Sequence, residues 1–376
     1  MNRILVVLFA LALTAVSPAR AALFLDPQLS LIGMGDVWSD PRFADLAGAG
    51  RTIAVVDSGI QTDHFMFTRP DDEEASRVID GANFAGDVAG TPDYADGHGH
   101  GTFVASVAAG SPIIYRYDSD PDTEFLLAGV AHQAQLASVR VFDSDGNAAS
   151  WATIRAGLEW VVDNADDLDI GVVNMSLGSE ATFASPEAFA ESSLADNPDA
   201  AAIAALVGSL RSQGIAVVAA SGNEEDDAGI AFPAILNDVF SVGATDLAGN
   251  LADLGNRSAD LDLFAPGEEI LGAALDGDLS LWDGTSFAAP FVSGAMILLQ
   301  ELYEQRTGDV ADPDLLMGIL QSTGEPVVEG DNTWHRLNVY AALDEVYAIP
   351  EPISAVVLGL PGMALLLLRR SSRQAA

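Results

Sequence analysis

The chain has 376 residues, of which 49% are hydrophobic, so it is long enough to bury one large core and shows no sign of disorder. It contains no cysteine, which excludes disulfides, cysteine-ligated metals and thiolate catalysis. Its formal net charge is −39 and all 16 basic residues are arginine, so binding to nucleic acid or anionic lipid is not expected. We interpret this charge as a solvated acidic surface, with calcium binding or attraction of cationic peptides as alternatives.

The first 21 residues have the pattern of a secretory signal peptide. Arg3 precedes an apolar run at positions 4–16, and Ala19-Arg20-Ala21 offers small residues for cleavage. The mature protein is therefore expected to begin near Ala22. An uncleaved membrane anchor is the alternative, but the apolar run is too short to span a bilayer comfortably.

Two motifs in the N-terminal part of the chain place polar side chains at the ends of predicted elements. Residues 51–59 (RTIAVVDSG) have the continuous apolar pattern of a buried parallel strand, with Asp57 at the carboxyl edge where α/β sheets bind ligands. A turn-forming aspartate is the alternative. Residues 96–109 (DGHGHGTFVASVAA) predict a glycine-rich turn and then a helix that begins near His100. The positive end of that helix should disfavour the imidazolium and keep the ring available as a base.

The histidines and the acidic segments raise the question of a metal. His98 and His100 could form a metal pair, but no third histidine lies nearby to complete it. The other histidines are isolated and are interpreted as packing or surface residues: His64, His132 and His335. Acidic loops are predicted at 118–124 and 224–227, and each could hold calcium, although neither has the spacing of a defined calcium loop. No metal ligand is assigned, and structural calcium remains an alternative.

Strand-like and helix-like segments alternate through the rest of the chain. Five apolar segments are predicted strands: 136–142, 170–175, 215–220, 239–243 and 261–264. Residues 150–164 predict a helix with one apolar face, which comprises Ile154, Leu158, Val161 and Val162, and residues 200–213 are a second candidate helix. This alternation predicts an α/β fold, a three-layer α/β/α sandwich with a mostly parallel central sheet.

One serine stands at the start of the most apolar predicted helix. Residues 283–290 (DGTSFAAP) lift Ser286 on a Gly-Thr turn, and residues 286–299 are apolar or small on every face, so this helix should run through the interior. The unpaired N–H groups at its start would hold a negatively charged oxygen beside the hydroxyl, as acyl transfer requires. An ordinary helix N-cap is the alternative for Ser286.

Taken together, the motifs around Asp57, His100 and Ser286 resemble the subtilase family, the subtilisin-like serine peptidases. The order Asp, His, Ser along the chain is the order in that family, and the matching blocks are AVVDSGI, GHGTFVAS and GTSFAAP. Two further blocks match, NMSLG at 174–178 and AASGN at 219–223. The resemblance covers roughly residues 28–346 and implies a subtilisin-like fold, so we assign residues 22–346 to one peptidase domain.

The resemblance also implies roles for individual residues. Ser286 would be the nucleophile, His100 the general base and acid, and Asp57 the group that orients the imidazole. Asn223 and the backbone N–H of Ser286 would hold the oxyanion, and the chemistry would need no cofactor. An extended substrate would be bound by Ser176, Leu177, Gly178, Ala219, Ala220, Ser221 and Gly222, with Ala231 at the base of the pocket for the residue before the cleaved bond. Its preference stays open, because the small Ala231 leaves room for a large side chain and Glu224 would attract a basic one.

Two features depart from or extend the family pattern. Many secreted subtilases carry a prodomain, yet only 35 residues separate Ala21 from Asp57 in this sequence. Folding without a covalent prodomain is therefore expected. Residues 111–126 and 180–199 are predicted to be surface insertions.

Residues 347–376 are a predicted sorting tail. Pro350-Glu351-Pro352, an apolar run at 353–368 and Arg369-Arg370 are similar to the PEP-CTERM sorting signals of Gram-negative bacteria. The apolar run would span roughly 24 Å as a helix, short of the ~30 Å hydrocarbon core, so a transient transmembrane helix fits better than a permanent one. Its arginines would stay in the cytoplasm. The resemblance implies cleavage by an exosortase, with a plain tail anchor as the alternative.

These features predict a secreted serine endopeptidase at the surface of a Gram-negative bacterium or outside it. The expected partners are polypeptide substrates, signal peptidase and an exosortase-like processing enzyme. Contact with the membrane is expected only through the tail, and a monomer is expected. Two rival functions are a non-catalytic, surface-anchored binding protein on the same fold and an esterase or transpeptidase that uses the same three residues.

Overall fold

A large, almost wholly parallel sheet forms the centre of the molecule. The computed structural model describes residues 4–7, 23–69, 75–87, 93–117, 120–147 and 150–351. Within them the central sheet has the strand order β16-β17-β13-β12-β10-β8-β3-β7-β4, and only β16 runs antiparallel to its neighbour. The strands are β3 (Thr52–Asp57), β4 (Val78–Asn83), β7 (Gln135–Arg140), β8 (Ile170–Met175), β10 (Ala216–Ala220), β12 (Phe240–Thr245), β13 (Leu263–Pro266), β16 (Glu325–Glu329) and β17 (Asn332–Arg336).

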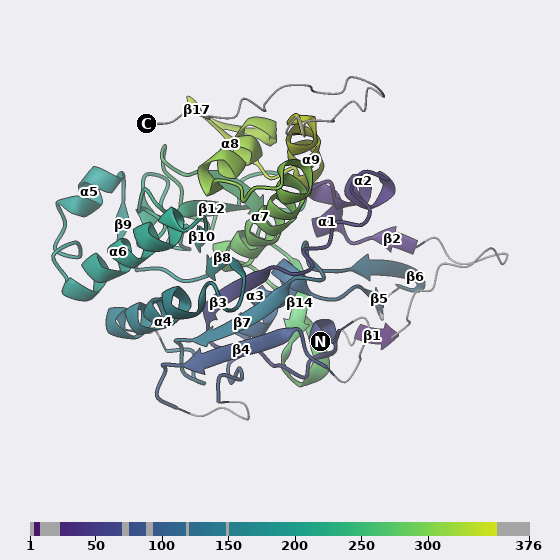
Figure 1. Ribbon diagram of the computed structural model, residues 1–376, viewed down its shortest axis with the longest axis horizontal. Coiled ribbons are helices and arrows are strands. Elements are labelled where there is room, and N and C mark those ends of the chain that lie inside the picture. Colours follow the sequence, from purple (N-terminus) through teal and green to yellow (C-terminus); the bar gives the residue numbers. More distant parts are fainter. Residues whose placement is uncertain are drawn as a thin grey trace, which may run out of the picture.

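Helices cover both faces of this sheet and so make three layers (Figure 1). One face packs against α1 (Pro27–Leu31), α2 (Met34–Ser39), α3 (His100–Ala109), α7 (Thr285–Thr307), α8 (Pro313–Thr323) and α9 (Val339–Ala348). The other packs against α4 (Trp151–Asn164) and α6 (Pro198–Ser212). Every residue of β3 is buried, because alternate side chains enter the two cores. The predicted three-layer α/β/α fold is confirmed.

The predicted elements lie close to the observed ones. The five predicted strands are β7, β8, β10, β12 and β13, with ends shifted by no more than two residues. The helix predicted at 150–164 is α4, and Ser150 caps it by accepting a hydrogen bond from the N–H of Thr153. Its apolar face is confirmed for Ile154, Leu158 and Val161, whereas Val162 is only partly buried.

The longest helix, α7, runs through the interior as its sequence predicts. Its residues from Phe287 to Gln300 are all buried, and it contacts α3 and the strands β8, β10, β12 and β13. Of the helices that the structure describes, it alone is long and apolar enough to cross a membrane, yet 89% of its most apolar stretch is buried in the protein. It is therefore the core helix of the sandwich.

A second sheet lies beside the sandwich and corrects one prediction. It has the order β1-β5-β6-β2, formed by β1 (Ile4–Val7), β5 (Ile113–Tyr117), β6 (Asp120–Leu127) and β2 (Leu23–Leu25). The prediction of an acidic loop at 118–124 is wrong, because most of that segment belongs to β6. Pairing with β5 and β2 on both sides outweighs its acidic composition, and the ring of Phe125 stacks on buried Tyr115 at 5.5 Å.

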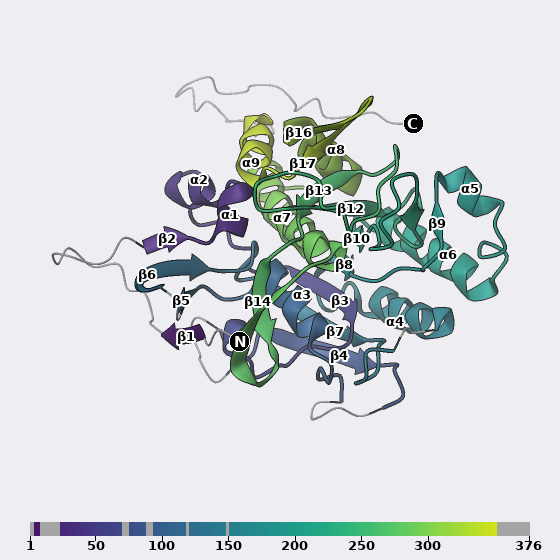
Figure 2. The ribbon, with the colours of Figure 1, turned by 180° about the vertical axis from the view of Figure 1, so that it is seen from behind.

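The smaller elements support the edge of the sheet where the catalytic motifs meet. The hairpin of β14 (Ile270–Ala274) and β15 (Asp278–Trp282) packs on α3 and leads into α7, and Figure 2 shows β14 beside α3. The predicted surface insertion at 180–199 contains β9 (Thr182–Phe183), α5 (Pro186–Ala190) and the start of α6, and β9 pairs with β11 (Ile230–Ala231). Single 3₁₀ turns are Phe65–Phe67 (η1) and Leu275–Gly277 (η2).

Candidate active site

Three neighbouring strands end together and bring distant motifs to one edge of the sheet. β10, β8 and β3 are adjacent and parallel, so their carboxyl ends share one edge. β3 ends at Asp57, β8 is followed by Ser176, and β10 is followed by the loop that carries Asn223. α3 and α7 both begin at this edge, with His100 and Ser286 in their first turns. The predicted placement of Asp57 at a strand end, and of His100 and Ser286 at helix starts, agrees with the structure.

The carboxylate of Asp57 holds the ring of His100. Asp57 is fully buried, and its Oδ1 lies 2.8 Å from His100 Nδ1. The same oxygen accepts a hydrogen bond of 2.7 Å from the N–H of Ser58. The close approach requires glycine at position 101, because a Cβ there would lie 2.2 Å from the carbonyl oxygen of Gly59 and 3.0 Å from Cβ of Asp57. Residue 101 therefore lets α3 sit directly on the end of β3.

Asp96 organises the turn before His100, and sequence reasoning did not identify it. It is 8% exposed, and its Oδ1 accepts hydrogen bonds from Ser58 Oγ and from the N–H groups of His98 and Gly99. Its Oδ2 accepts two more, from the N–H and Oγ1 of Thr102. The available signal was an aspartate that begins a glycine-rich turn four residues before the histidine.

The helix-dipole prediction for His100 is wrong in direction. Burial lowers the pKa of His100, but the negative charge and hydrogen bond of Asp57, with a further contribution from the charge of Asp96, outweigh burial and leave the pKa raised. A full carboxylate charge in direct contact acts more strongly than the partial charge at a helix end. The ring is therefore a stronger base than an isolated histidine.

Ser286 lies in the first turn of α7, next to Phe287, whose ring contacts that of His100. Gly284 precedes the helix with φ +150°, a conformation that side chains disfavour, so the Gly-Thr turn depends on that glycine. The hydroxyl of Ser286 donates to the carbonyl of Ser176 over 3.3 Å, and Ser176 Oγ donates back to the carbonyl of Ser286 over 2.6 Å. The adjacent Phe287 ring lies 5.3 Å from that of His100.

The side-chain oxygen of Asn223 is committed to the same turn. Its Oδ1 accepts hydrogen bonds of 2.9 Å from both the N–H and Oγ1 of Thr285. The amide NH₂ is therefore turned away from Thr285, and a Cβ built on Gly284 would lie 3.4 Å from Asn223 Nδ2. Thr285 is thus a positioning residue. It belongs to the GTSFAAP motif, but no role for it was predicted from the sequence.

Most of the residues predicted to bind substrate are buried; of this set, Gly178 is exposed and Gly222 is half-buried. A pocket of about 170 Å³ at this edge of the sheet is lined by Asp57, Ser58, His98, His100, Phe142, Gly146 and Ser176. Ala219, Ala220 and Ser221 are buried, and the N–H of Ser221 bonds to Val242 of the next strand. These residues support the wall from behind, and the predicted contact of their backbone with substrate stays a prediction.

Ala231 lies close to Gly178 and Gly222, and its place at a pocket base stays a prediction. A Cβ on Gly178 would lie 2.9 Å from Cβ of Ala231, and one on Gly222 would lie 3.2 Å from it. Leu177, next to Gly178, is buried. The carboxylate of Glu224 is held at this place by Asn256, whose Nδ2 donates to Oε2 over 2.5 Å. Asn256 was not identified from sequence, and no motif marked it.

Three of the candidate calcium ligands in the segment 224–227, namely Glu224, Asp226 and Asp227, have protein partners. Within the part of the chain that the structure describes, no three histidine, aspartate or glutamate side chains gather as ligands. In the segment 224–227, Glu224 accepts from Asn256, Asp226 from Thr182 and the N–H of Ala228, and Asp227 pairs with Arg257. Its carboxylates therefore point to separate protein partners. His64 is buried and His132 and His335 are partly buried, as expected of packing residues.

Comparison with known proteins decides the family. The sequence model of the family described as "Subtilase family" matches residues 48–336. "Subtilisin-like protease 3" of Pseudogymnoascus destructans is 36% identical over 253 residues, 66% of this chain and 52% of its own length. "Intracellular serine protease" of Paenibacillus polymyxa is 30% identical over 78% of this chain and 80% of its own. "Subtilisin BL" of Lederbergia lenta is 34% identical over 68% of this chain and 78% of its own.

The chain belongs to the subtilase family. A solved structure, "Crystal structure of a cold adapted subtilisin-like serine proteinase", matches this subtilase with a TM-score of 0.63 and 27% identity, over 84% of this chain and 98% of the other. The family and the fold make this subtilase a serine endopeptidase that acts on polypeptides. The chain spans about half the length of the fungal relative named above.

The two predicted ends of this subtilase are largely outside the described residues. Of the predicted signal peptide (1–21), only Ile4–Val7 is described, as strand β1 paired with β5. The predicted sorting tail is described as far as residue 351, and its apolar run at 353–368 lies outside. Both remain predictions, as does the domain range 22–346.

Proposed function

We propose that Asp57, His100 and Ser286 carry the endopeptidase activity as a catalytic triad. The observation that carries the proposal is the 2.8 Å contact between Asp57 Oδ1 and His100 Nδ1, at the edge of the sheet where the first turn of α7 carries Ser286. That contact fixes the tautomer with the proton on Nδ1 and leaves Nε2 free to accept a proton. The raised pKa of His100 makes the ring a strong acceptor.

The reaction follows from these positions. Ser286 Oγ attacks the carbonyl carbon of the peptide bond while its proton passes to His100 Nε2, and Asp57 stabilises the imidazolium. The ring then gives that proton to the leaving amine, and the acyl group stays on Ser286. Water, activated by the same ring, cleaves the ester and restores the hydroxyl. In the absence of substrate the hydroxyl donates to the Ser176 carbonyl, so the reaction requires this hydroxyl to turn from that carbonyl to Nε2 of His100.

The oxyanion of the tetrahedral intermediate is held by Asn223 and by the backbone N–H of Ser286. Asn223 presents its NH₂ because Thr285 occupies its oxygen, and the N–H of Ser286 belongs to the first turn of α7, where no carbonyl four residues earlier is available in the helix. The backbone of Ser176 to Gly178 binds the extended substrate at the rim. Glu224 and Ala231 form the pocket for the side chain before the cleaved bond, which accepts large or basic residues.

Labelling with a fluorophosphonate tests this assignment. The wild-type protein is expected to be labelled on Ser286 and to cleave a denatured protein mixture, whereas Ser286→Ala should lose both properties. In subtilisin itself, loss of the nucleophilic serine lowers kcat about 10⁶-fold, and a loss of that order is expected here. A binding protein without activity would resist labelling. An esterase or transpeptidase would be labelled but would hydrolyse ester libraries, or transfer the acyl group, in preference to hydrolysing peptides.

We further propose that the protein is exported and held at the cell surface or released. The signal-peptide pattern at 1–21 and the sorting-tail pattern at 347–376 support this location, with signal peptidase and an exosortase-like enzyme as processing partners. Mass spectrometry of the protein from its native membrane and medium should find an N-terminus near Ala22 and a C-terminus before the apolar run. Intact ends in a cytoplasmic fraction would contradict the proposal.

A further inference from the structure

A proline near the start of α7 deprives the carbonyl of Ser286 of its helical hydrogen bond. In an α-helix each carbonyl accepts from the N–H four residues later, and for Ser286 that residue is Pro290, which has no N–H. The proline ring also crowds the same carbonyl. Because backbone carbonyls in the interior are almost always hydrogen-bonded, the turn that carries Ser286 needs a donor from outside the helix.

The hydroxyl of Ser176 is that donor. Its Oγ donates to the carbonyl of Ser286 over 2.6 Å, and Ser176 is only 3% exposed. Ser176 directly follows β8, so this bond joins the carboxyl end of the strand to the first turn of α7. The carbonyl of Ser176 in turn accepts from Ser286 Oγ. Ser176 therefore contacts both the backbone and the side chain of Ser286.

Two fully buried residues fix the direction of the Ser176 hydroxyl. Asn174 Nδ2 donates to Ser176 Oγ over 3.0 Å, so the hydroxyl directs its own proton to the carbonyl of Ser286. Asn174 Oδ1 accepts from Ser293 Oγ over 2.8 Å, which fixes the orientation of the amide. These bonds form one continuous chain that begins at Ser293 in α7, passes through β8 and ends on the first turn of α7.

The chain accounts for two polar residues in apolar surroundings. Every residue of β8 is buried, and Asn174 pairs there with Val55 of β3 and Val218 of β10. A serine inside a helix often bonds to a carbonyl of its own helix, whereas Ser293 donates to Asn174. Buried polar side chains are unfavourable unless they are hydrogen-bonded, and the chain supplies those bonds to both residues.

We propose that the Ser176 hydroxyl replaces the hydrogen bond that Pro290 removes and so holds the turn of Ser286 against the end of β8. Asn174 and Ser293 are positioning residues, because both are fully buried and act through Ser176. The inference rests on the proposed role of Ser286 as the nucleophile. Attack on a peptide carbonyl depends on close alignment, so a loosened turn lowers the rate of the chemical step rather than the affinity for substrate.

A double-mutant cycle between positions 176 and 290 tests the proposal. The second-order rate constant of fluorophosphonate labelling, measured on folded protein below the unfolding transition, reports the alignment of Ser286. Ser176→Ala should lower this constant about tenfold. Pro290→Ala restores an N–H four residues after Ser286, so in that background the loss caused by Ser176→Ala should be less than about threefold. An equal loss in both backgrounds, or no loss in either, would overturn the proposal.

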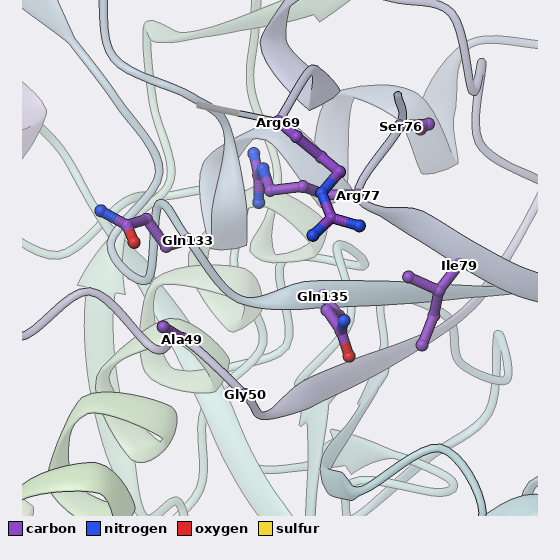
Figure 3. Close-up of a pocket in the computed structure, with 8 residues that line it drawn as sticks. All are labelled: Ala49, Gly50, Arg69, Ser76, Arg77, Ile79, Gln133 and Gln135. Atoms are coloured by element: carbon purple, nitrogen blue, oxygen red, sulfur yellow. The ribbon is translucent and has the colours of Figure 1, made fainter. Parts of the chain in front are cut away.

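A further pair of variants keeps the test decisive if Pro290→Ala disturbs folding. Ser293→Ala removes the far end of the chain and should lower the labelling rate constant about threefold. The matched control is Ser76→Ala, which removes a hydroxyl that accepts from the N–H of Val78. Ser76 precedes β4 and lines a pocket of about 310 Å³ at the amino edge of the sheet, the edge opposite to Ser286 (Figure 3). Equal rate constants for Ser293→Ala and Ser76→Ala would refute the chain.

Peptide kinetics and the wild-type protein separate this inference from the triad itself. Ser176→Ala should lower kcat about tenfold and leave KM within about twofold, and a change confined to KM would mean that the hydroxyl acts on substrate, against the proposal. A wild-type protein that resists labelling would overturn the triad and this inference together. A labelled wild type whose rate constant is unchanged in Ser176→Ala would overturn this inference alone.

Discussion

Replacement of Asp96 by asparagine tests whether this buried carboxylate both holds the turn before His100 and strengthens the base. Asp96 accepts five hydrogen bonds of 2.6 to 2.9 Å, three at Oδ1 and two at Oδ2. The amide oxygen of an asparagine can keep the three donors at Oδ1. Its NH₂ group would then face the N–H of Thr102. Both groups are donors, so the N–H of Thr102 would lose the acceptor that Asp96 Oδ2 provides.

The expected loss of stability follows from those contacts. A buried N–H left without an acceptor costs about 1–3 kcal/mol, and three hydrogen bonds that lose charge assistance weaken by about 1 kcal/mol each. We therefore expect Asp96→Asn to lower the free energy of unfolding by about 4–6 kcal/mol. The charge of Asp96 also contributes to the raised pKa of His100, so its removal should lower that pKa. Because activity requires the neutral ring, the acid limb of kcat/KM should move to lower pH.

Denaturant unfolding and the pH profile of kcat/KM measure the two effects. Asp163→Asn, an exposed position on α4, removes the same charge far from the turn and should change stability by less than about 0.5 kcal/mol, with no movement of the acid limb. An acid limb that stays in place or moves to higher pH in Asp96→Asn would refute the electrostatic reasoning. Unchanged stability would refute the hydrogen-bond reasoning.

Three further predictions concern other contacts of the site and core. Thr285→Val should lower kcat about tenfold with little change in KM, because Asn223 loses one of the two hydrogen bonds that orient its amide group. Thr285→Ser keeps the hydroxyl and should retain activity in the same assay. Gly294→Ala should destabilise the protein by about 1–3 kcal/mol in thermal unfolding, because a Cβ at position 294 would lie 2.7 Å from Cβ of Val130. The control is Gly318→Ala in α8, which has open space around it and should be neutral or stabilising. Glu224→Gln should lower kcat/KM for substrates with arginine before the cleaved bond about five- to tenfold relative to phenylalanine, and an equal loss for both would contradict a charged pocket.

The predicted elements and motif positions came from local signals that survive folding. A strand buried on both faces must be apolar at every position, so β3, β8 and β10 are visible as apolar runs, and the polar residues that end them mark the edge. The Gly-Thr turn before Ser286 and the glycine-rich turn before His100 identify two helix starts. Their order along the chain indicated the family, which the comparisons confirm.

Contacts between segments that are distant in the chain could not be predicted from such local patterns. The strand at 120–127 forms because β5 and β2 offer partners on both sides, which its acidic composition does not reveal. The direction of the pKa shift of His100 depends on a carboxylate 43 residues away, at 2.8 Å in space, and not on the helix that the sequence predicts.

The sequence by itself determined the class of fold, the family and the residues that meet at the carboxyl edge, because these follow from short-range patterns of apolar and turn-forming residues. Only the tertiary structure decided what surrounds each of them: that Asp96 supports the turn before His100, and that Thr285 orients Asn223. Whether a polar group is buried, and which group it bonds to, depends on residues that are near it in space but distant in the chain. The order of residues along the chain does not show these contacts.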